Sequence, residues 1–529
     1  MYLAGGACLL YSQIGIVEVE MIGGIISGTA HITGPQFEQL VRRAVVEFSV
    51  SGYKEGDTVA LLLQNDITFL VAMTALGRSG IYAATLNWHS HPDEAAYILK
   101  DCGARAVLIQ EELFARFAAA IPDGIAIYVV GSNLQSAGTK SGSSSRARGI
   151  ALDWNQRVAG RPDTEREPLR SRGVIVYTSG TTGRPKGVLR EPFVSREAEA
   201  KQAEQLTAVF GGRVGMRTVI CGPLYHGGPS AYARLAIRNL GNDGLIVLHQ
   251  KFDAEMLLKD VETYSITHLW LVPTMFHRML TLTEAIRNKY RTSSLEWIIH
   301  GAAPCPAWVK QGMLQWLGPV IREFYGTTET GPVTLASPEM AMSRPGTVGK
   351  RLPGVTVTIR DEAGIQLPPG TIGEICCSNK YYPDFTYINR IDDRRALDIA
   401  DEVRTGDLGE IDQDGYLFIR DRKKDMVIVG GVNIYPAEIE SVLIAMPEAY
   451  DCAAFGIPDD EYGEVLAVAV VPKDEMEITE DAVKKYLAQH QASYKTPRKV
   501  FIVSHIPRED SGKLFKRKLR DQLVGGTLG

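Results

Sequence analysis

The sequence has no excess of basic charge and little cysteine. Its 57 lysines and arginines stand against 62 acidic residues, which gives a net charge of -5. A chain without a basic surplus is not expected to hold a polyanion, so nucleic acid is not predicted as a partner. The seven cysteines are an odd number and include no CxxC pair, which indicates neither a disulfide framework nor a zinc knuckle. This usage is typical of the reducing cytoplasm, where we expect the protein to reside.

Long apolar runs are also missing. Residues 1–26 are fairly apolar, but they lack a basic leading region and are interrupted by Glu18 and Glu20. We therefore expect neither a signal peptide nor an integral membrane segment. Hydrophobic residues make up 45% of the chain and charged residues 22%, close to the averages for globular proteins. At 529 residues, the chain exceeds the size of one hydrophobic core, so more than one domain is predicted.

The order of the apolar runs predicts an α/β fold. Runs rich in β-forming residues at 58–62 and 106–109 are separated by a helix-like pattern at 69–76. This alternation is typical of βαβ units and of a largely parallel sheet. The Ser- and Gly-rich stretch 131–149 has no apolar periodicity and predicts an exposed loop.

The character of the chain changes at the charged run DRKKD, residues 421–425. The elements that follow it are an apolar strand at 426–429, a helix opened by Pro436 with one buried face, a strand at 465–471 and a helical stretch at 480–489. We predict a large multi-sheet N-terminal α/β domain over residues 1–420. A small, mobile C-terminal α+β domain is predicted over residues 421–529.

The strongest chemical signal is the stretch YTSGTTGRPKG, residues 177–187, which follows a strand-like run at 173–177. Glycines allow backbone N–H groups to turn inward, hydroxyls add donors and Lys186 adds positive charge, which together favour a polyphosphate site. The stretch is not a Walker loop, because the spacing of glycine and lysine differs and Gly187 follows the lysine. The candidate phosphate contacts are Thr178, Ser179, Gly180, Thr181, Thr182, Gly183 and Lys186.

With this loop the chain resembles the adenylate-forming superfamily, which includes acyl-CoA synthetases, luciferase-like enzymes and peptide-synthetase adenylation domains. The signature loop of that superfamily reads YTSGTTGxPKGV, and the match continues through Val188. Further signature segments follow in the same order, namely PLYH at 223–226, GAAP at 301–304, YGTTE at 325–329, TGD at 405–407, DRKKD at 421–425, GGVN at 430–433 and SGK at 511–513.

The resemblance implies a set of nucleotide contacts. Thr328 would lie near the α-phosphate, and Glu329 would be a ligand of the Mg²⁺ that neutralises the phosphates as pyrophosphate leaves. Asp407 would accept hydrogen bonds from both ribose hydroxyls, Arg422 would be a second ribose contact, and Tyr325 would face the adenine. The other residues assigned to the nucleotide are Gly301, Ala302, Ala303, Gly326 and Thr327.

The resemblance also implies two poses of the C-terminal domain. In the first pose Lys513 would meet the acid's carboxylate and the α-phosphate during adenylation, where a cation offsets the developing negative charge. A rotation about Lys424 would then withdraw this lysine. In the second pose Gly430 and Gly431 would leave a channel for the pantetheine arm of coenzyme A, because glycine has no side chain to block it.

The segment PLYHGG is the candidate acyl pocket, and its histidine resembles the gate that the superfamily places there. The candidate lining residues are Tyr225, His226, Gly227 and Gly228. In the resemblance, peptide-synthetase domains place an aspartate in this region to hold the ammonium group of their substrate, and this segment contains none. An amino acid is therefore a poor candidate substrate, because its ammonium group would lack a partner. The small residues at 227, 228, 302 and 303 favour a roomy pocket for a fatty, aryl or polycyclic acid.

The resulting prediction is an ATP-dependent carboxylic acid:CoA ligase that forms acyl-AMP and then acyl-CoA, releasing pyrophosphate and AMP, with ATP, the acid, CoA and Mg²⁺ as its partners. One alternative is a fatty acyl-AMP ligase serving a carrier protein. The resemblance disfavours it, because that group characteristically carries an insertion shortly before the hinge and no extra segment is seen between Glu329 and Asp421. Others are a luciferase-like monooxygenase and an inactive binding module. The complete set Lys186, Glu329, Asp407 and Lys513 argues against the inactive module. The oligomeric state is left open, with a homodimer as one option.

Overall fold

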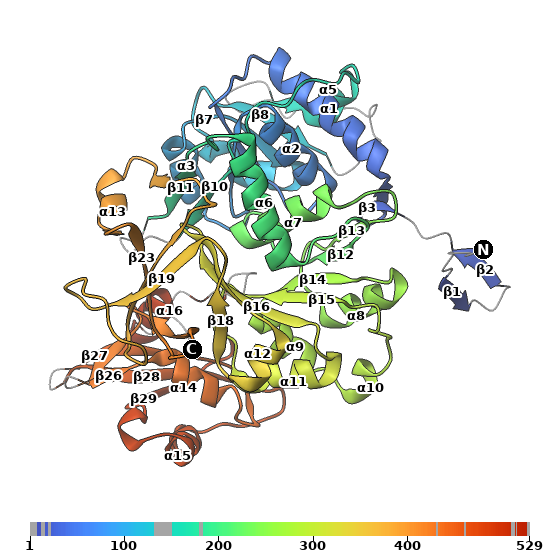
Figure 1. The fold of residues 1–529 in the computed structure, drawn as a ribbon. Helices are drawn as coiled ribbons and strands as arrows, with labels where there is room; N and C mark the ends of the chain where they lie inside the picture. Colours follow the sequence, from blue (N-terminus) through green and yellow to red (C-terminus); the bar gives the residue numbers. More distant parts are fainter. Residues whose placement is uncertain are drawn as a thin grey trace. The chain divides into compact units, whose positions relative to one another are not determined.

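The computed structural model describes residues 23–131, 151–178, 184–429, 432–459, 462–508, 514 and 516–525, together with the backbone of the paired strands β1 (Cys8–Tyr11) and β2 (Ile16–Val19) (Figure 1). The chain divides into two compact units. Unit 1 comprises residues 1–270, 284–298 and 381–396, and unit 2 comprises residues 271–283, 299–380 and 397–529. Across the described ranges, no helix has the length and apolar character needed to cross a membrane.

The first sheet of unit 1 has the order β21-β11-β10-β6-β5-β7-β8-β9. Its strands are β5 (Thr58–Leu62), β6 (Tyr82–Thr85), β7 (Ala104–Gln110), β8 (Ala126–Val130), β9 (Leu152–Asp153), β10 (Val174–Thr178), β11 (Lys186–Arg190) and β21 (Phe385–Tyr387). Neighbouring strands from β10 to β9 are parallel, whereas β11 and β21 pair antiparallel. Every residue of β5 is buried, as expected for a strand covered on both faces. The predicted parallel α/β arrangement is confirmed.

Several helices of unit 1 begin at a residue whose side chain caps the helix. At the start of α2, for example, the Asp66 carboxylate accepts a hydrogen bond of 2.9 Å from the N–H of Thr68. The predicted helical pattern at 69–76 lies within α2. The helices are α1 (Gly34–Val50), α2 (Ile67–Arg78), α3 (Pro92–Asp101), α4 (Glu111–Phe117), η1 (Ala118–Ala120), α5 (Trp154–Ala159), α6 (Arg196–Phe210), α7 (Gly227–Arg238), α8 (Ala254–Thr263), α10 (Glu284–Arg287) and α13 (Ile391–Arg395).

Unit 1 contains a second group of strands in the order β14-β12-β13-β3-β4. They are β3 (Gly24–Ser27), β4 (Ala30–Ile32), β12 (Arg217–Ile220), β13 (Leu245–Leu248) and β14 (His268–Leu271). The pairs β14 with β12, β12 with β13, and β13 with β3 are parallel. The predicted loop at 131–149 lies, after its first residue, outside the described residues.

Unit 2 contains a group of antiparallel strands, which lie in the sheet in the order β19-β20-β23-β24-β18-β17-β16. They are β16 (Ile321–Thr327), β17 (Gly331–Ala336), β18 (Thr347–Arg351), β19 (Val355–Arg360), β20 (Gly373–Asn379), β23 (Glu402–Ile411) and β24 (Tyr416–Arg422). The short strand β22 (Asp398–Ile399) pairs with β23. The remaining elements before residue 421 are α9 (Pro273–Leu280), β15 (Trp297–His300), α11 (Ala307–Leu317) and α12 (Pro338–Ser343).

The C-terminal part of unit 2 has a three-stranded sheet of β27 (Ala449–Asp459), β28 (Gly463–Pro472) and β29 (Lys499–Ile502). Alternate residues of β27 and β28 belong to two different apolar clusters, so both faces of this sheet are covered. One cluster includes residues of α14 (Pro436–Leu443) and α15 (Glu480–His490), and the other includes residues of α16 (Lys516–Val524). The other elements are β25 (Val427–Val429), β26 (Val432–Ile434) and η2 (Ser493–Lys495).

The predicted helix after Pro436 is confirmed with a small difference. The spacing of Ile439, Val442, Leu443 and Met446 predicts the buried face, and Ile439 and Leu443 are fully buried. The helix ends at Leu443, so the buried Met446 packs from the turn that follows rather than from the helix itself.

Candidate active site

The two ends of the phosphate loop face each other in unit 1. Thr178 ends β10 and is the register partner of Lys186, which begins β11. Behind the loop, the Tyr177 hydroxyl donates a hydrogen bond of 2.8 Å to Asp101. Gly187 lies against the Tyr177 ring, where a Cβ atom would come within 2.8 Å of Cζ. The predicted contacts Ser179, Gly180, Thr181, Thr182 and Gly183 lie outside the described residues.

The ammonium of Lys186 is already paired. Its Nζ lies 2.8 Å from a carboxylate oxygen of Asp393 in α13 and 5.1 Å from the centroid of the Tyr387 ring. The hydrogen bond from Lys186 holds the pKa of Asp393 below its usual range. A polyphosphate that binds Lys186 therefore has to compete with this carboxylate, a partner that the sequence analysis missed.

The candidate acyl segment is held in place by two buried side chains, Asn65 and Thr85. The Asn65 amide oxygen accepts a hydrogen bond from the N–H of Leu224, and its amide nitrogen donates to the carbonyls of Gly222 and His249, each at 2.9 Å. The Thr85 hydroxyl donates to the carbonyl of Tyr225 at 2.9 Å. Asn65 follows β5 at its carboxyl end, the edge at which parallel α/β sheets form their sites. That position is the only signal in the sequence that could have identified it.

His226 and the two glycines after it begin α7. His226 is the N-cap residue, and its side chain makes no capping hydrogen bond. Its ring lies 4.5 Å from that of Tyr225. A Cβ atom at Gly228 would lie 2.8 Å from the indole of Trp270. The expectation of a roomy pocket is therefore wrong at Gly228, because the absence of a side chain admits Trp270 rather than leaving space.

In unit 2 a buried carboxylate marks the predicted ribose contact. Asp407 in β23 is the register partner of Arg422 in β24 and is only 6% exposed. The Tyr325 hydroxyl donates to its Oδ2 at 2.8 Å, and Arg422 Nε lies 3.4 Å from its Oδ1. Burial raises the pKa of Asp407, while Arg422 and Tyr325 act in the opposite direction. The site therefore contains a carboxylate that is held in one orientation.

Tyr325 is itself almost entirely covered. It is 7% exposed, and burial raises its pKa well above the usual value. The evident task of its hydroxyl in this structure is to orient Asp407. Its predicted contact with adenine stays a prediction.

Residues 328–330 form a turn that connects β16 to β17. The Thr327 hydroxyl oxygen accepts hydrogen bonds from the N–H groups of Glu329 and Thr330, each at 3.2 Å. Gly326 faces Gly331 so closely that a Cβ atom would lie 2.2 Å from the Gly331 carbonyl oxygen. Thr328 and Glu329 therefore belong to a tight turn between two strands, and this turn positions Glu329.

The GAAP segment lies against the same strand. A Cβ atom at Gly301 would lie 2.6 Å from the Phe324 carbonyl oxygen. Ala302 has a φ of 68°, a conformation that costs energy for a residue with a side chain and that is enriched at functional sites. The structure thus brings the predicted residues at 301–303, 325–329 and 407 together around β16.

A buried ion pair lies next to this segment. Lys310 of α11 contacts the carboxylate of Glu323 in β16 and donates to the Thr347 carbonyl at 3.2 Å. Burial raises the pKa of Glu323. His300, which precedes Gly301, is fully buried with its Nδ1 atom 4.0 Å from Glu323. Burial holds the pKa of His300 well below its usual value, so the imidazole is neutral.

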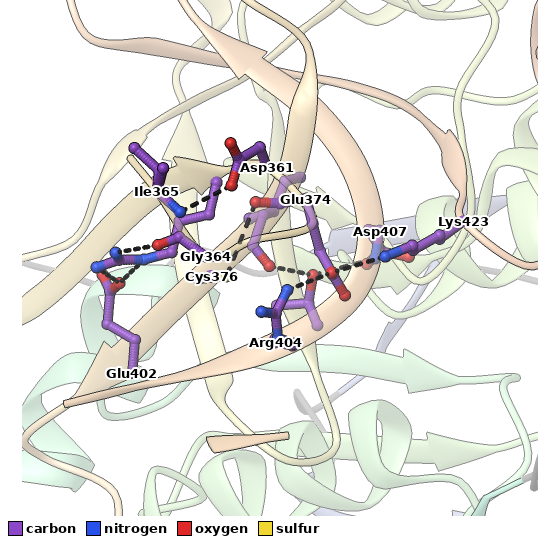
Figure 2. A network of polar contacts seen from close by, with 12 residues as sticks. Asp361, Gly364, Ile365, Glu374, Cys376, Glu402, Arg404, Asp407 and Lys423 are labelled. Carbon is purple, nitrogen blue, oxygen red and sulfur yellow. Dashed lines mark hydrogen bonds and ion pairs between the residues drawn. The ribbon is translucent and has the colours of Figure 1, made fainter. Parts of the chain in front are cut away.

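The predicted hinge run is tied to the antiparallel sheet up to Lys423. Figure 2 shows Glu374 between Arg404 and Lys423, whose nitrogens lie 2.8 Å and 3.2 Å from it. The N–H of Lys423 also donates to the Gly406 carbonyl at 2.9 Å. Lys424 is exposed to solvent and makes no such hydrogen bond or ion pair among the described residues. Partial desolvation by its neighbours lowers the pKa of its ammonium. Gly430, Gly431 and Lys513 lie outside the described residues.

These features agree with the site predicted for an adenylate-forming enzyme, because the ends of the predicted phosphate loop, the buried Asp407 carboxylate and the turn that carries Glu329 occur in one α/β chain. Comparison with known proteins gives the family. The sequence model of the AMP-binding enzyme family matches residues 19–382, and that of the AMP-binding enzyme C-terminal domain matches residues 438–513. The chain belongs to this family of AMP-binding enzymes.

Characterised relatives cover almost the whole chain. The chain is 30% identical to the fatty acid–[acyl-carrier-protein] ligase ScoC of Streptomyces coeruleorubidus, over 93% of this chain and 92% of that protein. It is 29% identical to the 2-succinylbenzoate–CoA ligase of Bacillus licheniformis, over 94% and 96%. The structure of ATP-bound MatB from Rhodopseudomonas palustris matches with a TM-score of 0.81 at 27% identity, over 97% of each chain.

Family membership confirms three predictions made from the sequence. The resemblance to the adenylate-forming superfamily, the α/β fold with a smaller C-terminal part, and the class of AMP-forming acid–thiol ligase are all borne out. The roles of individual site residues stay predictions.

The pairing of Lys186 leads to a test of the phosphate loop. Asp393→Asn should lower the apparent KM for ATP by up to about fivefold, because it removes a carboxylate that competes with the phosphates, and a partly exposed pair is worth at most about 1 kcal/mol. Initial rates at varied ATP would measure this. Asp392→Asn on the same helix is the matched control, since Asp392 is 95% exposed and lies 3.8 Å from Arg395. A raised KM in Asp393→Asn would show that the pair supports nucleotide binding instead.

The contacts of Asn65 predict a loss of stability. Asn65→Ala should lower the free energy of unfolding by about 2–4 kcal/mol, because three buried main-chain groups lose their partner. Urea unfolding followed by circular dichroism would measure the change. Gln64→Ala is the neighbouring control, because the side chain of Gln64 makes no hydrogen bond among the described residues, while its backbone N–H donates to Gln110. Equal stability of the two variants would be incompatible with the proposed anchoring role.

The buried ion pair between Lys310 and Glu323 predicts a larger loss of stability, which a second substitution should reverse. Lys310→Met should destabilise the protein by about 3–5 kcal/mol, because the Glu323 carboxylate stays buried without its cation. The double variant Lys310→Met with Glu323→Leu should regain most of this loss, which a double-mutant cycle would measure. Lys201→Met, which breaks an exposed pair with Glu204, serves as the control. A stable Lys310→Met single variant would mean that the charges are not buried in solution.

Proposed function

We propose that this enzyme uses ATP to convert a carboxylic acid with a largely apolar body into its acyl-adenylate, and then transfers the acyl group to the thiol of coenzyme A. The observation that carries the proposal is the buried carboxylate of Asp407, fixed by Tyr325 and paired with Arg422. A carboxylate held away from water in one orientation is a strong acceptor for two neighbouring hydroxyls, which is the chemistry of a ribose contact.

In the first half-reaction a carboxylate oxygen of the acid attacks the α-phosphorus of ATP, and pyrophosphate leaves. Lys186 would leave Asp393 and hold the phosphate chain, together with the hydroxyl and N–H donors of the loop. Lys513 would offset the charge that gathers where the carboxylate meets the phosphate. Thr328 would lie at the α-phosphate, next to the turn that Thr327 fixes.

The donor set suits a magnesium ion that arrives with the nucleotide. Mg²⁺ is commonly held by one or two carboxylates together with substrate phosphates, and Glu329 supplies one carboxylate on a fixed turn. No group of three or more metal-ligating side chains occurs among the residues that the structure describes. Glu329 would therefore hold the ion jointly with phosphate oxygens, and the ion would neutralise the charge of the departing pyrophosphate.

For the second half-reaction we propose that the part of the C-terminal domain that follows Lys424 rotates as a small domain about this residue. Two observations support this. The sheet of β27, β28 and β29 has an apolar cluster on each face, so this part carries its own core. The hinge run is tied to β20 and β23 through Lys423, which leaves Lys424 as the first residue free to change its backbone angles. Gly430 and Gly431 would then border the pantetheine channel.

The names of relatives support coenzyme A as acceptor and leave the acid open. They include ligases for 2-succinylbenzoate, long-chain fatty acids and oxalate, all with coenzyme A. One relative is named as an acyl-carrier-protein ligase, so a carrier protein is the second candidate acceptor. Two further proposals concern the protein as a whole. The cysteine usage supports a cytoplasmic location. A homodimer is one candidate oligomeric state, and light scattering would test it.

A two-stage assay separates these candidates. The enzyme is first incubated with ATP, Mg²⁺ and a mixture of acids while pyrophosphate is measured, and coenzyme A or a carrier protein with its pantetheine arm is then added. Pyrophosphate followed by acyl-CoA supports the proposal. Pyrophosphate with transfer only to the carrier protein favours the second acceptor, and no pyrophosphate with any acid favours an inactive binding module.

The ribose contact gives a quantitative prediction. Asp407→Ala should raise the dissociation constant for ATP by about 10- to 100-fold, because it removes hydrogen bonds to a charged group worth about 1.5–3 kcal/mol. Tyr325→Phe should raise it by about 3- to 10-fold, since the carboxylate remains but loses its orientation. Calorimetry would measure both values, with Tyr416→Phe in β24 as the control. Unchanged affinity in Asp407→Ala would remove this residue from the nucleotide site.

A further inference from the structure

Helix α7 carries two arginines, Arg234 and Arg238, one turn apart. Both are exposed, and neither forms an ion pair with a carboxylate within the described parts of the chain. Like charges at this spacing disfavour a helix by about 0.2–0.5 kcal/mol. Arg238 lies in the last turn, where the helix dipole favours a cation. Arg234 lies in the middle of the helix and has no such compensation.

The surroundings of Arg234 are neutral or basic. Its Nη1 donates a hydrogen bond of 3.0 Å to the hydroxyl of Ser230, which is itself buried and lies 3.3 Å from the sulfur of Met73. Nearby, the guanidinium of Arg190 stacks on the ring of Tyr382 at 4.9 Å. Desolvation lowers the pKa of Arg234, with Tyr382 acting in the opposite direction and Arg238 in the same one. The guanidinium is thus exposed and is held by a neutral hydroxyl rather than by a carboxylate, so its other donors can bind an incoming anion.

The position of Arg234 relates it to the candidate acyl segment. His226 is the N-cap residue of α7, and the N–H of Ser230 donates to its carbonyl at 3.1 Å. Ser230 and Arg234 follow at four and eight residues, so they lie on the same side of the helix as the histidine. Eight residues of α-helix advance by about 12 Å. An acid that is activated beside His226 and extends along α7 would reach Arg234 over that distance.

We propose that Arg234 binds a second carboxylate at the far end of the substrate, so that the enzyme acts on dicarboxylic acids with an apolar chain or ring between the two acid groups. This inference rests on the proposed function. A guanidinium presents a planar fork of donors that matches a carboxylate in a bidentate way. A simple fatty acid would instead place its methyl end against an uncompensated cation, which is unfavourable.

The test compares acids of equal length that differ only at the far end. Suberate is measured against octanoate, and sebacate against decanoate, as kcat/KM for pyrophosphate release. The native enzyme should prefer each dicarboxylate. Arg234→Met should lower the ratio of dicarboxylate to monocarboxylate by about 10- to 100-fold, as expected for loss of hydrogen bonds to a charged group. Arg234→Lys should keep part of the preference, and it stands in if Arg234→Met does not fold.

Arg238→Met is the matched control, because it removes the same charge from the same helix one turn further on. It should change the ratio much less than Arg234→Met does. Equal effects of the two variants would overturn the inference, because they would reflect the net charge of the helix rather than a contact. A native preference for the monocarboxylates would also overturn it. Pyrophosphate release with none of many acids would instead reject the proposed function itself.

Discussion

The orientation of one buried carboxylate is the constraint on which the proposed chemistry depends. Asp407 is charged when it works as a ribose acceptor, yet it is only 6% exposed, and burying an unpaired charge is costly. Two contacts offset this cost: the Tyr325 hydroxyl donates a hydrogen bond to one carboxylate oxygen, and the Arg422 guanidinium lies near the other. Because Asp407 and Arg422 are register partners of adjacent strands, the strand pairing itself sets their separation.

Strand β16 links this carboxylate to the rest of the candidate site. Glu323 and Tyr325 alternate with Phe324 along the strand, so they lie on one face and Phe324 on the other. Glu323 forms the buried pair with Lys310, whereas the backbone of Phe324 closes against Gly301. The strand ends in the turn that positions Glu329. A change in the packing of β16 would therefore affect the nucleotide site through several contacts at once.

Local patterns predicted much of the fold. The strand at 58–62, the helical pattern at 69–76 and the strand at 465–471 are all present, because apolar periodicity reports which face of an element is buried. The candidate site was reached through signature segments rather than through periodicity. Their order along the chain was sufficient to identify the family.

Contacts between distant parts of the chain were not predictable in this way. Asn65 holds a loop at residues 222–224, and Asp393 pairs with Lys186, but no local pattern reports either partner. The expectation of space at Gly228 failed for the same reason, because the indole that fills it belongs to Trp270. A small residue leaves space beside the backbone, but the sequence alone does not show whether a substrate or another side chain occupies that space.

The central claim is that the acid attacks the α-phosphorus of ATP, and an isotope measurement tests it most directly. The reaction would be run with an acid whose carboxylate oxygens are labelled with heavy oxygen, and the nucleotide and phosphate products would be examined by mass spectrometry. An acyl-adenylate that passes its acyl group to a thiol must leave one labelled oxygen in the phosphate of AMP. Label in inorganic phosphate, with ADP as the nucleotide product, would contradict the account.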